Sequence, residues 1–264
     1  MTGEARQVVL LLADISGYTR FMVAHEKTLR HSQTIIGALL ESLMEQVGPP
    51  LNVGEVQGDA LFMYAFKNDD GDDWSRQGSR LMTRVLGLFD VFAQRLAQIG
   101  AYSVCRCEAC ANMNKLQLKV IAHSGEALLN KVGEFTVLSG VDVIRLHRLA
   151  KNSVDCGEYV LMSEPAFRDL GGPISATAKE HVEEYDVGSL KTYVHLPSPK
   201  RTFDEADLVA DAGDTNIGLE ILRDEIRREY TEVAQEPERG YHFNTGRRAA
   251  GVLGYEDAWL DPIP

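Results

Sequence analysis

Residues 8–19 read VVLLLADISGYT, an apolar run that ends in an aspartate just before a serine-glycine turn. A continuous apolar run predicts a strand buried in the middle of a sheet. Residues 56–66 read VQGDALFMYAF, and here Gly58 and Asp59 predict the tip of a tight β-hairpin. If this hairpin pairs beside the first strand, the carboxylates of Asp14 and Asp59 face one pocket. Two carboxylates on rigid strands, each beside a glycine that lets a phosphate approach, suit a two-magnesium phosphoryl-transfer site.

Both segments resemble the metal-binding motifs of the class III nucleotidyl cyclases in form, order and separation. The resemblance covers residues 7–196. It implies a ferredoxin-like core in which long helices pack on a mostly antiparallel sheet, so the expected fold class is α+β. The pattern along the chain agrees, and it predicts helices at residues 19–47, 74–99, 139–150 and 163–170 and strands at residues 7–13, 50–66, 116–123, 158–162, 180–186 and 191–196.

The resemblance implies a role for each of the two aspartates. Asp14 and Asp59, assisted by the carbonyl of Ile15, are expected to hold two Mg²⁺ or Mn²⁺ ions that bind a nucleoside triphosphate. One ion would lower the pKa of the ribose 3′-hydroxyl while the other holds the triphosphate. Because the family builds its active site from both protomers, we expect a homodimer or a heterodimer with another cyclase domain.

Residues 140–149, GVDVIRLHRL, resemble a third family motif, which lies on a helix. The resemblance places Arg148 on the arginine that stabilises charge on the transferred phosphoryl group. The asparagine expected four residues after Gly140 is Ile144, which cannot hydrogen-bond a ribose. Loss of one positioning group can cost orders of magnitude in rate. Two functions are therefore open: a cyclase that forms a 3′,5′-cyclic nucleotide and pyrophosphate, and a nucleotide-binding regulatory module without efficient chemistry.

Four further positions are compared with the family. Glu55 lies at the purine-selecting position and favours guanine, because a carboxylate accepts from the guanine amino and ring N–H groups. Val137, at the second selecting position, offers no hydrogen bond. Lys191 lies near the triphosphate-binding lysine. His123 ends the predicted central strand before a turn at residues 124–125, and it is either a family feature or an ordinary strand-end histidine.

The family does not explain a cysteine-rich insertion at residues 101–115. Cys105, Cys107 and Cys110 fall within six residues, and three thiolates in this pattern can hold zinc, with Cys156 or a histidine as the fourth ligand. The paired C-x-x-C arms of a typical zinc site are missing. A redox-sensitive loop and ordinary reduced thiols are the alternatives, and a zinc-organised interaction protein is a third functional hypothesis.

Composition limits the remaining classes. The formal net charge of −12 argues against nonspecific nucleic-acid binding, because phosphates need a basic patch. No apolar run approaches the length of a membrane span, and the N-terminus lacks a basic-then-apolar signal. We therefore predict a cytoplasmic protein without a membrane span.

Two prolines at residues 197–199 suggest a linker that divides the chain. We predict a cyclase-like domain at residues 1–197 and an acidic extension at residues 198–264, which holds 15 acidic and 8 basic side chains. Within it, residues 217–232 have the apolar spacing of a helix. Residues 241–255 are faintly similar to the lead-in of some S-adenosylmethionine-dependent methyltransferases, but no such fold follows. The extension is interpreted as a docking segment for a protein partner or for the dimer partner.

Overall fold

The computed structural model describes residues 5–25, 29–67, 74–102, 108–132, 135–185, 188–200, 202–204, 208, 227–228 and 230–236. The strands in these residues are β1 (Ala5–Ser16), β2 (Asn52–Gln57), β3 (Ala60–Phe66), β4 (Gln117–Val132), β5 (Phe135–Ser139), β6 (Tyr159–Ser163), β7 (Lys179–Tyr185) and β8 (Gly188–His195). The helices are α1 (Tyr18–Ala24), α2 (Leu29–Glu45), α3 (Trp74–Tyr102), α4 (Glu108–Asn112), α5 (Val141–Leu149) and α6 (Glu164–Leu170), with 3₁₀ turns η2 (Met113–Lys115) and η3 (Gly172–Ile174).

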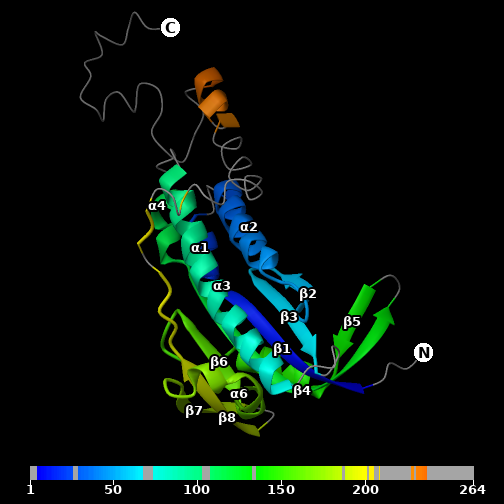
Figure 1. Ribbon diagram of the computed structural model, residues 1–264. Helices are drawn as coiled ribbons and strands as arrows, with labels where there is room; N and C mark the ends of the chain where they lie inside the picture. The colour runs from blue at the N-terminus through cyan, green and yellow to red at the C-terminus, as the bar shows by residue number, and fades with distance from the viewer. Residues whose placement is uncertain are drawn as a thin grey trace, which may run out of the picture.

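The described strands form one sheet in the order β2-β3-β1-β4-β6-β8-β7, and β5 pairs with the far end of β4. The pairing of β4 with β6 is parallel, and the other pairings are antiparallel. Figure 1 shows the long helices α2 and α3 lying across one face of this sheet. The expected α+β class with a mostly antiparallel sheet is therefore confirmed.

The central strand β1 is buried on both faces, as its continuous apolar run predicts. Val9, Leu11 and alternate neighbours pack against the helices on one face. Val8 and Leu10 point to the other face, where they pack in a second cluster with residues of α5. The strand β1 thus contributes side chains to both cores, because successive side chains of a strand point to opposite faces of the sheet.

The single helix expected at residues 19–47 is wrong, because α1 ends at Ala24 and a separate helix, α2, begins at Leu29. His25 leaves helical geometry, with φ −117° and ψ 33°. Its ring Nδ1 lies 2.6 Å from the carbonyl oxygen of Phe21, and the ring packs at a tilt against the ring of Phe21, with 4.7 Å between centroids. A side chain that bonds a terminal carbonyl competes with continuation of the helix.

The turn expected at residues 124–125 is also wrong, since β4 runs straight through this position to Val132. The extra length of β4 pairs with β5, a strand that the sequence pattern did not indicate. Gly125 has a different role from the expected one. A Cβ at this position would overlap the carboxylate of Asp142 at the start of α5, so glycine allows the helix to approach the sheet.

Only part of the acidic extension is described. Residues 227–228 and 230–235 are helical, which agrees with the helix predicted at residues 217–232. The rest of that segment lies outside the described residues. The division of the chain at residue 197 stays a prediction.

Alanine substitutions at two glycines of α3 test how tightly α3 packs on α6. A Cβ at Gly78 would overlap the backbone carbonyl of Asp169 in α6, whereas a Cβ at Gly87 would meet nothing within 4 Å. We expect Gly78→Ala to lower the free energy of unfolding by about 2 kcal/mol, since overpacking against backbone costs ~1–3 kcal/mol. Gly87→Ala is expected to raise it by about 0.5–1 kcal/mol through helix propensity.

Urea denaturation of the two variants measures both changes. The pair is matched, because each adds one methyl group to the same helix. Equal effects of the two substitutions would contradict the close packing of α3 on α6.

Candidate functional site

The ends of two neighbouring strands place Asp14 and Asp59 at one pocket. Asp14 is paired with Ala60 across β1 and β3, and Asp59 lies in the turn just before β3. The backbone N–H of Ile15 donates to the carbonyl of Asp59 at 3.2 Å, which fixes the turn against β1. The pocket has a volume of about 490 Å³ and is lined by Asp14, Ile15, Ser16, Gly17, Tyr18, Thr19, Arg20, Asp59, Lys115, Gln117, Lys119 and Gly157.

The two carboxylates are close enough to affect each other. Burial, followed by the negative charge of Asp14, raises the pKa of Asp59 to about 7. A hydrogen bond with Asp14 acts in the same direction. Removal from water and a like charge both disfavour ionisation of a carboxyl group. Positive charge close to the two carboxylates therefore stabilises their ionised forms.

Lys119 supplies part of that charge from the neighbouring strand β4. It is paired with Asp14 across β1 and β4, and its Nζ lies 2.9 Å from Oδ2 of Asp14. Burial opposes the charged form of Lys119, but the hydrogen bond and the charge of Asp14 outweigh burial and raise its pKa. The pocket lining also contains Arg20 and Lys115, so the two carboxylates face more than one basic side chain.

This donor set fits a hard divalent cation. Carboxylate oxygens are the ligands that Mg²⁺ and Mn²⁺ prefer, and Mg²⁺ typically takes one or two protein carboxylates and completes its shell with water and substrate phosphates. Asp14 and Asp59 provide such a pair. Among the described residues there is no group of three or more His, Cys, Asp or Glu side chains that could hold a metal ion. The carbonyl of Ile15, which also lines the pocket, stays a predicted further ligand beside a bound phosphate and water.

Helix α5 is anchored to β4 by a buried hydrogen-bond network. The ring of His123 lies 2.7 Å from Oγ of Ser163 through Nδ1 and 3.0 Å from Oδ1 of Asp142 through Nε2. The Ser163 hydroxyl donates to Nδ1, so a neutral imidazole with its proton on Nε2 satisfies both contacts. Asp142 also accepts from the N–H of Glu126 at 2.8 Å and from Arg145 at 2.7 Å. The network fixes the first turn of α5.

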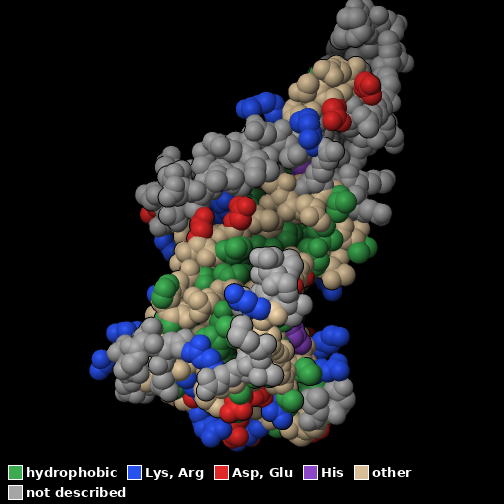
Figure 2. Space-filling view, turned by 90° about the vertical axis from the view of Figure 1, so that its right-hand side faces the viewer, with side chains coloured by type: hydrophobic (Ala, Val, Ile, Leu, Met, Phe, Trp, Pro, Cys, Tyr) green, Lys and Arg blue, Asp and Glu red, His purple; other side chains and the backbone are tan. Residues whose placement is uncertain are grey.

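A cluster of exposed apolar side chains covers one side of the molecule, over β2, β4, β5 and α5. We call it the β2–α5 face; its members are Val53, Val56, Leu128, Val137, Val141 and Ile144. Figure 2, which views the side where β2 and β5 lie, shows hydrophobic side chains gathered across its middle. Contiguous exposed apolar surface of this kind marks interaction sites in soluble proteins.

The sequence matches one protein family and one relative of unknown function. Residues 36–159 match a family described as protein of unknown function (DUF2652). The chain is 28% identical over 156 residues to the uncharacterized protein Rv2561/Rv2562 of Mycobacterium tuberculosis, a match that covers 59% of this chain and 70% of that protein.

Solved structures with the same architecture are nucleotide cyclases. The adenylyl cyclase CyaB from P. aeruginosa matches with a TM-score of 0.55 and 11% identity, over 77% of this chain and 100% of that chain. The guanylyl cyclase Cya2 matches with a TM-score of 0.53 and 12% identity, over 75% and 97%. The fold is that of the class III nucleotidyl cyclases. The predicted ferredoxin-like cyclase core is confirmed, whereas none of these matches supports the methyltransferase similarity of residues 241–255, which lie outside the described residues.

Within this cyclase fold, three predicted site residues lie away from the carboxylate pocket. Arg148 is on α5, on the opposite side of the sheet from α2 and α3, and it is half-buried. Glu55 is exposed on β2, where it accepts from Gln57 at 2.9 Å. Lys191 is exposed on β8 and pairs with Glu180 at 2.9 Å, a contact that raises its pKa to about 12. The described part of one chain does not bring any of the three to the pocket lining.

Sequence analysis of the cyclase motifs missed Lys119. The signal was present, because a lysine interrupts the apolar run of residues 118–122 where a buried strand is expected. Its contact with Asp14 depends on the register of β1 with β4, which no local pattern indicates.

The zinc site predicted at Cys105, Cys107 and Cys110 is not supported by the structure or by the comparisons. Cys105 and Cys107 lie outside the described residues. Cys110 is 7% exposed and packs in the helix-side core, and Cys156 is exposed on the loop after α5. No described helix has both the length and the apolar character needed to cross a membrane.

The His123 network predicts how stability changes with pH. Burial lowers the pKa of His123 below its ordinary value of ~6.5, more than Asp142 raises it. The unfolded chain therefore binds more protons than the folded chain near pH 6, so the free energy of unfolding falls as the pH drops from 7 to 5. The His123→Gln variant should show a smaller fall. Asp142, whose pKa is lowered, adds a loss of stability only below about pH 4.

Urea denaturation at a series of pH values measures this dependence. His147→Gln, which changes a histidine of α5 outside the network, is the control and should keep the wild-type slope. If the free energy of unfolding of His123→Gln fell with pH as steeply as that of the wild type, protonation of His123 would not be the cause of the fall.

Proposed function

We propose that the protein is a metal-dependent nucleotidyl cyclase domain. The proposal rests on one observation, the shared pocket of Asp14 and Asp59 in a cyclase fold. In the reaction the ribose 3′-oxygen attacks the α-phosphorus of a nucleoside triphosphate, and the bond from that phosphorus to the β-phosphate oxygen breaks. The products are a 3′,5′-cyclic nucleotide and pyrophosphate, with the hydroxyl proton released to solvent. The two aspartates would hold the divalent cation that the triphosphate requires.

The proposed site contains one metal ion next to a fixed ammonium. Two ions are the expectation from the family, but Lys119 already lies 2.9 Å from Asp14. A first divalent cation between the two carboxylates would neutralise them, whereas a second would meet both that cation and Lys119. In this arrangement Lys119 provides charge that a second metal ion provides in a two-metal site.

Dimerisation through the β2–α5 face would complete the proposed site. Arg148 is on α5 and Glu55 is on β2, and both elements contribute to that face. Neither side chain lines the carboxylate pocket of its own chain. In a dimer that buries the apolar face, the guanidinium of one protomer could reach the phosphates bound by the other, and Glu55 would favour guanine over adenine.

A second candidate function is nucleotide binding without efficient turnover. Ile144 is 53% exposed on the β2–α5 face, where the family has an asparagine that positions the ribose. An apolar side chain cannot provide that hydrogen bond. In this hypothesis the fold and the cation site remain, and the protein acts as a regulatory module.

The cation site is tested first by Mn²⁺ binding, measured by electron paramagnetic resonance. We expect one Mn²⁺ per protomer in the presence of a nucleoside triphosphate, and at least tenfold weaker binding in Asp14→Asn and Asp59→Asn. Lys119→Met should tighten Mn²⁺ binding by about fivefold or more, because unit charges ~4 Å apart interact by ~1 kcal/mol even in water. Glu41→Gln and Lys131→Met are exposed controls without an expected effect. Two Mn²⁺ ions per wild-type protomer would contradict the role of Lys119.

The second test measures cyclic nucleotide formed from GTP and ATP with Mn²⁺. Asp59→Asn and Arg148→Ala should each lose about a hundredfold or more in rate, which is typical for removal of one charge-stabilising group. An equal mixture of the two variants should recover about a quarter of the wild-type rate, because half of the dimers then contain one intact site. Product without recovery in the mixture would refute the shared site. Metal-dependent nucleotide binding without product would favour the regulatory module.

A further inference from the structure

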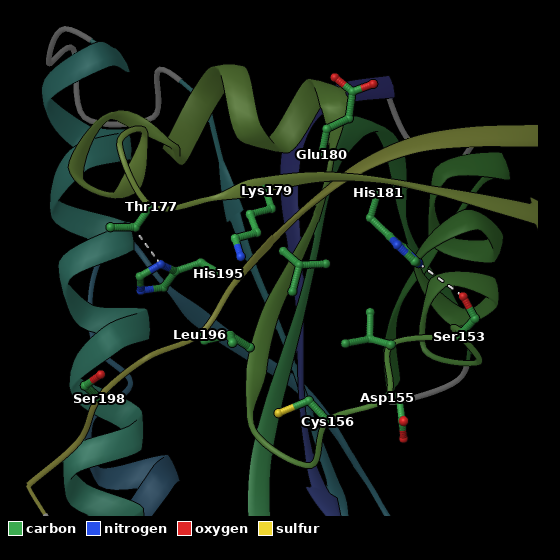
Figure 3. Close-up of a pocket in the computed structure, with 12 residues that line it drawn as sticks. Ser153, Asp155, Cys156, Thr177, Lys179, Glu180, His181, His195, Leu196 and Ser198 are labelled. Carbon is green, nitrogen blue, oxygen red and sulfur yellow. Dashed lines mark hydrogen bonds between the residues drawn. The ribbon is translucent and has the colours of Figure 1, made fainter.

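A second cavity, of about 630 Å³, lies beneath the loop that follows α5. Its walls are residues 153–156 of that loop, the start of β7, the end of β8 and the segment after β8 (Figure 3). It shares no lining residue with the carboxylate pocket. The proposed cyclase reaction uses none of its side chains.

Partly buried hydrogen bonds hold the loop in place over this cavity. Glu183 of β7 is 5% exposed, and its Oε1 accepts from the N–H of Ser153 at 2.7 Å and from the Ser153 hydroxyl at 2.9 Å. His181 lies 2.8 Å from the same oxygen. Asn152 accepts from the N–H of Val154 at 3.1 Å and from the hydroxyl of Tyr159 at 2.9 Å. The cavity is therefore formed before any ligand arrives, as small-molecule sites usually are.

The ammonium of Lys179 faces the cavity, and no described carboxylate forms an ion pair with it. In Figure 3 the ammonium of Lys179 points inward beside His195, whereas the carboxylates of Glu180 and Asp155 point away. Glu180 is paired with Lys191 at 2.9 Å. Lys179 forms no ion pair with any residue that the structure describes. An anionic group in the cavity would therefore gain a partner at Lys179 without displacing another carboxylate.

The remaining lining is mixed in polarity. Val154, Val194 and Leu196 provide an apolar surface. The ring of His195 is hydrogen-bonded through Nδ1 to Thr177 at 2.9 Å, and burial lowers its pKa, so the ring is neutral near pH 7. One ammonium is too little charge for a nucleoside triphosphate. The lining matches a ligand with one acidic group and an apolar body.

We propose that this cavity is a binding site for a small organic acid, with the carboxylate on Lys179 and the apolar body on Val154, Val194 and Leu196. The site is separate from the proposed catalytic pocket and does not depend on cyclase activity. Benzoate and benzamide are suitable probes, because they have nearly the same shape and only benzoate is charged.

The alkylation rate of Cys156 shows whether a ligand occupies the cavity, because the exposed sulfur of Cys156 points into it (Figure 3). The rate of its alkylation by iodoacetamide is followed by mass spectrometry of the peptide that contains it, with the full chain folded. Benzoate at about twice its dissociation constant should slow alkylation about threefold, and benzamide at the same concentration should not. Lys179→Met should abolish the protection, and the exposed control Lys131→Met should keep it.

Each outcome decides the proposal. The alkylation rate of Lys179→Met without benzoate shows whether the variant keeps the loop in place, and Val194→Trp, which fills the cavity, provides an independent second variant. Protection by benzoate that is lost in both variants supports the site. Absence of protection in the wild type, equal protection by benzamide, or protection that persists in Lys179→Met would overturn it.

Discussion

The antiparallel pairing of β1 with β4 is the constraint on which the site depends. Twelve consecutive residue pairs join these strands, from Ala5 with Leu128 to Ser16 with Gln117. A slip by one residue would exchange the side chains of β1 between the two cores and would move Asp14 out of line with Lys119. The same register sets Lys119 opposite Asp14. It also places His123 and Gly125 where the first turn of α5 packs.

The parts of the fold that follow local patterns could be predicted from sequence. The apolar run before Asp14 and the glycine next to Asp59 are signals that lie within a few residues, and both elements formed as expected. Gly125 was misinterpreted because glycine marks either a turn or a close approach, and the sequence near it is compatible with both. The approach of Asp142 depends on a helix that begins 16 residues later. The role of Lys119 likewise depends on a partner strand far away in the chain.

Arg148 and the two aspartates lie at different places in the fold, and the sequence does not show how they are related. The carboxylate pocket lies at the ends of β1 and the β2–β3 turn, and Asp14 points to the same face of the sheet as Val8 and Leu10, the face on which α5 packs. Arg148 of α5 lies on that face too, but its side chain does not line the pocket of its own chain. The exposed apolar residues of the β2–α5 face include residues of the same helix, so association and completion of the proposed site would depend on one surface.

The loop between α5 and β6 borders two cavities. Residues 153–156 line the cavity beneath it, and the next residue, Gly157, lines the carboxylate pocket together with Gln117. A Cβ at Gly157 would overlap the end of the Gln117 side chain, so glycine allows the loop to lie close to β4 at this point. Coupling between two sites is reciprocal in free energy. A molecule that shifts this loop from one cavity would alter the affinity of the other cavity for its ligand, and that ligand would alter the affinity for the first molecule by the same factor.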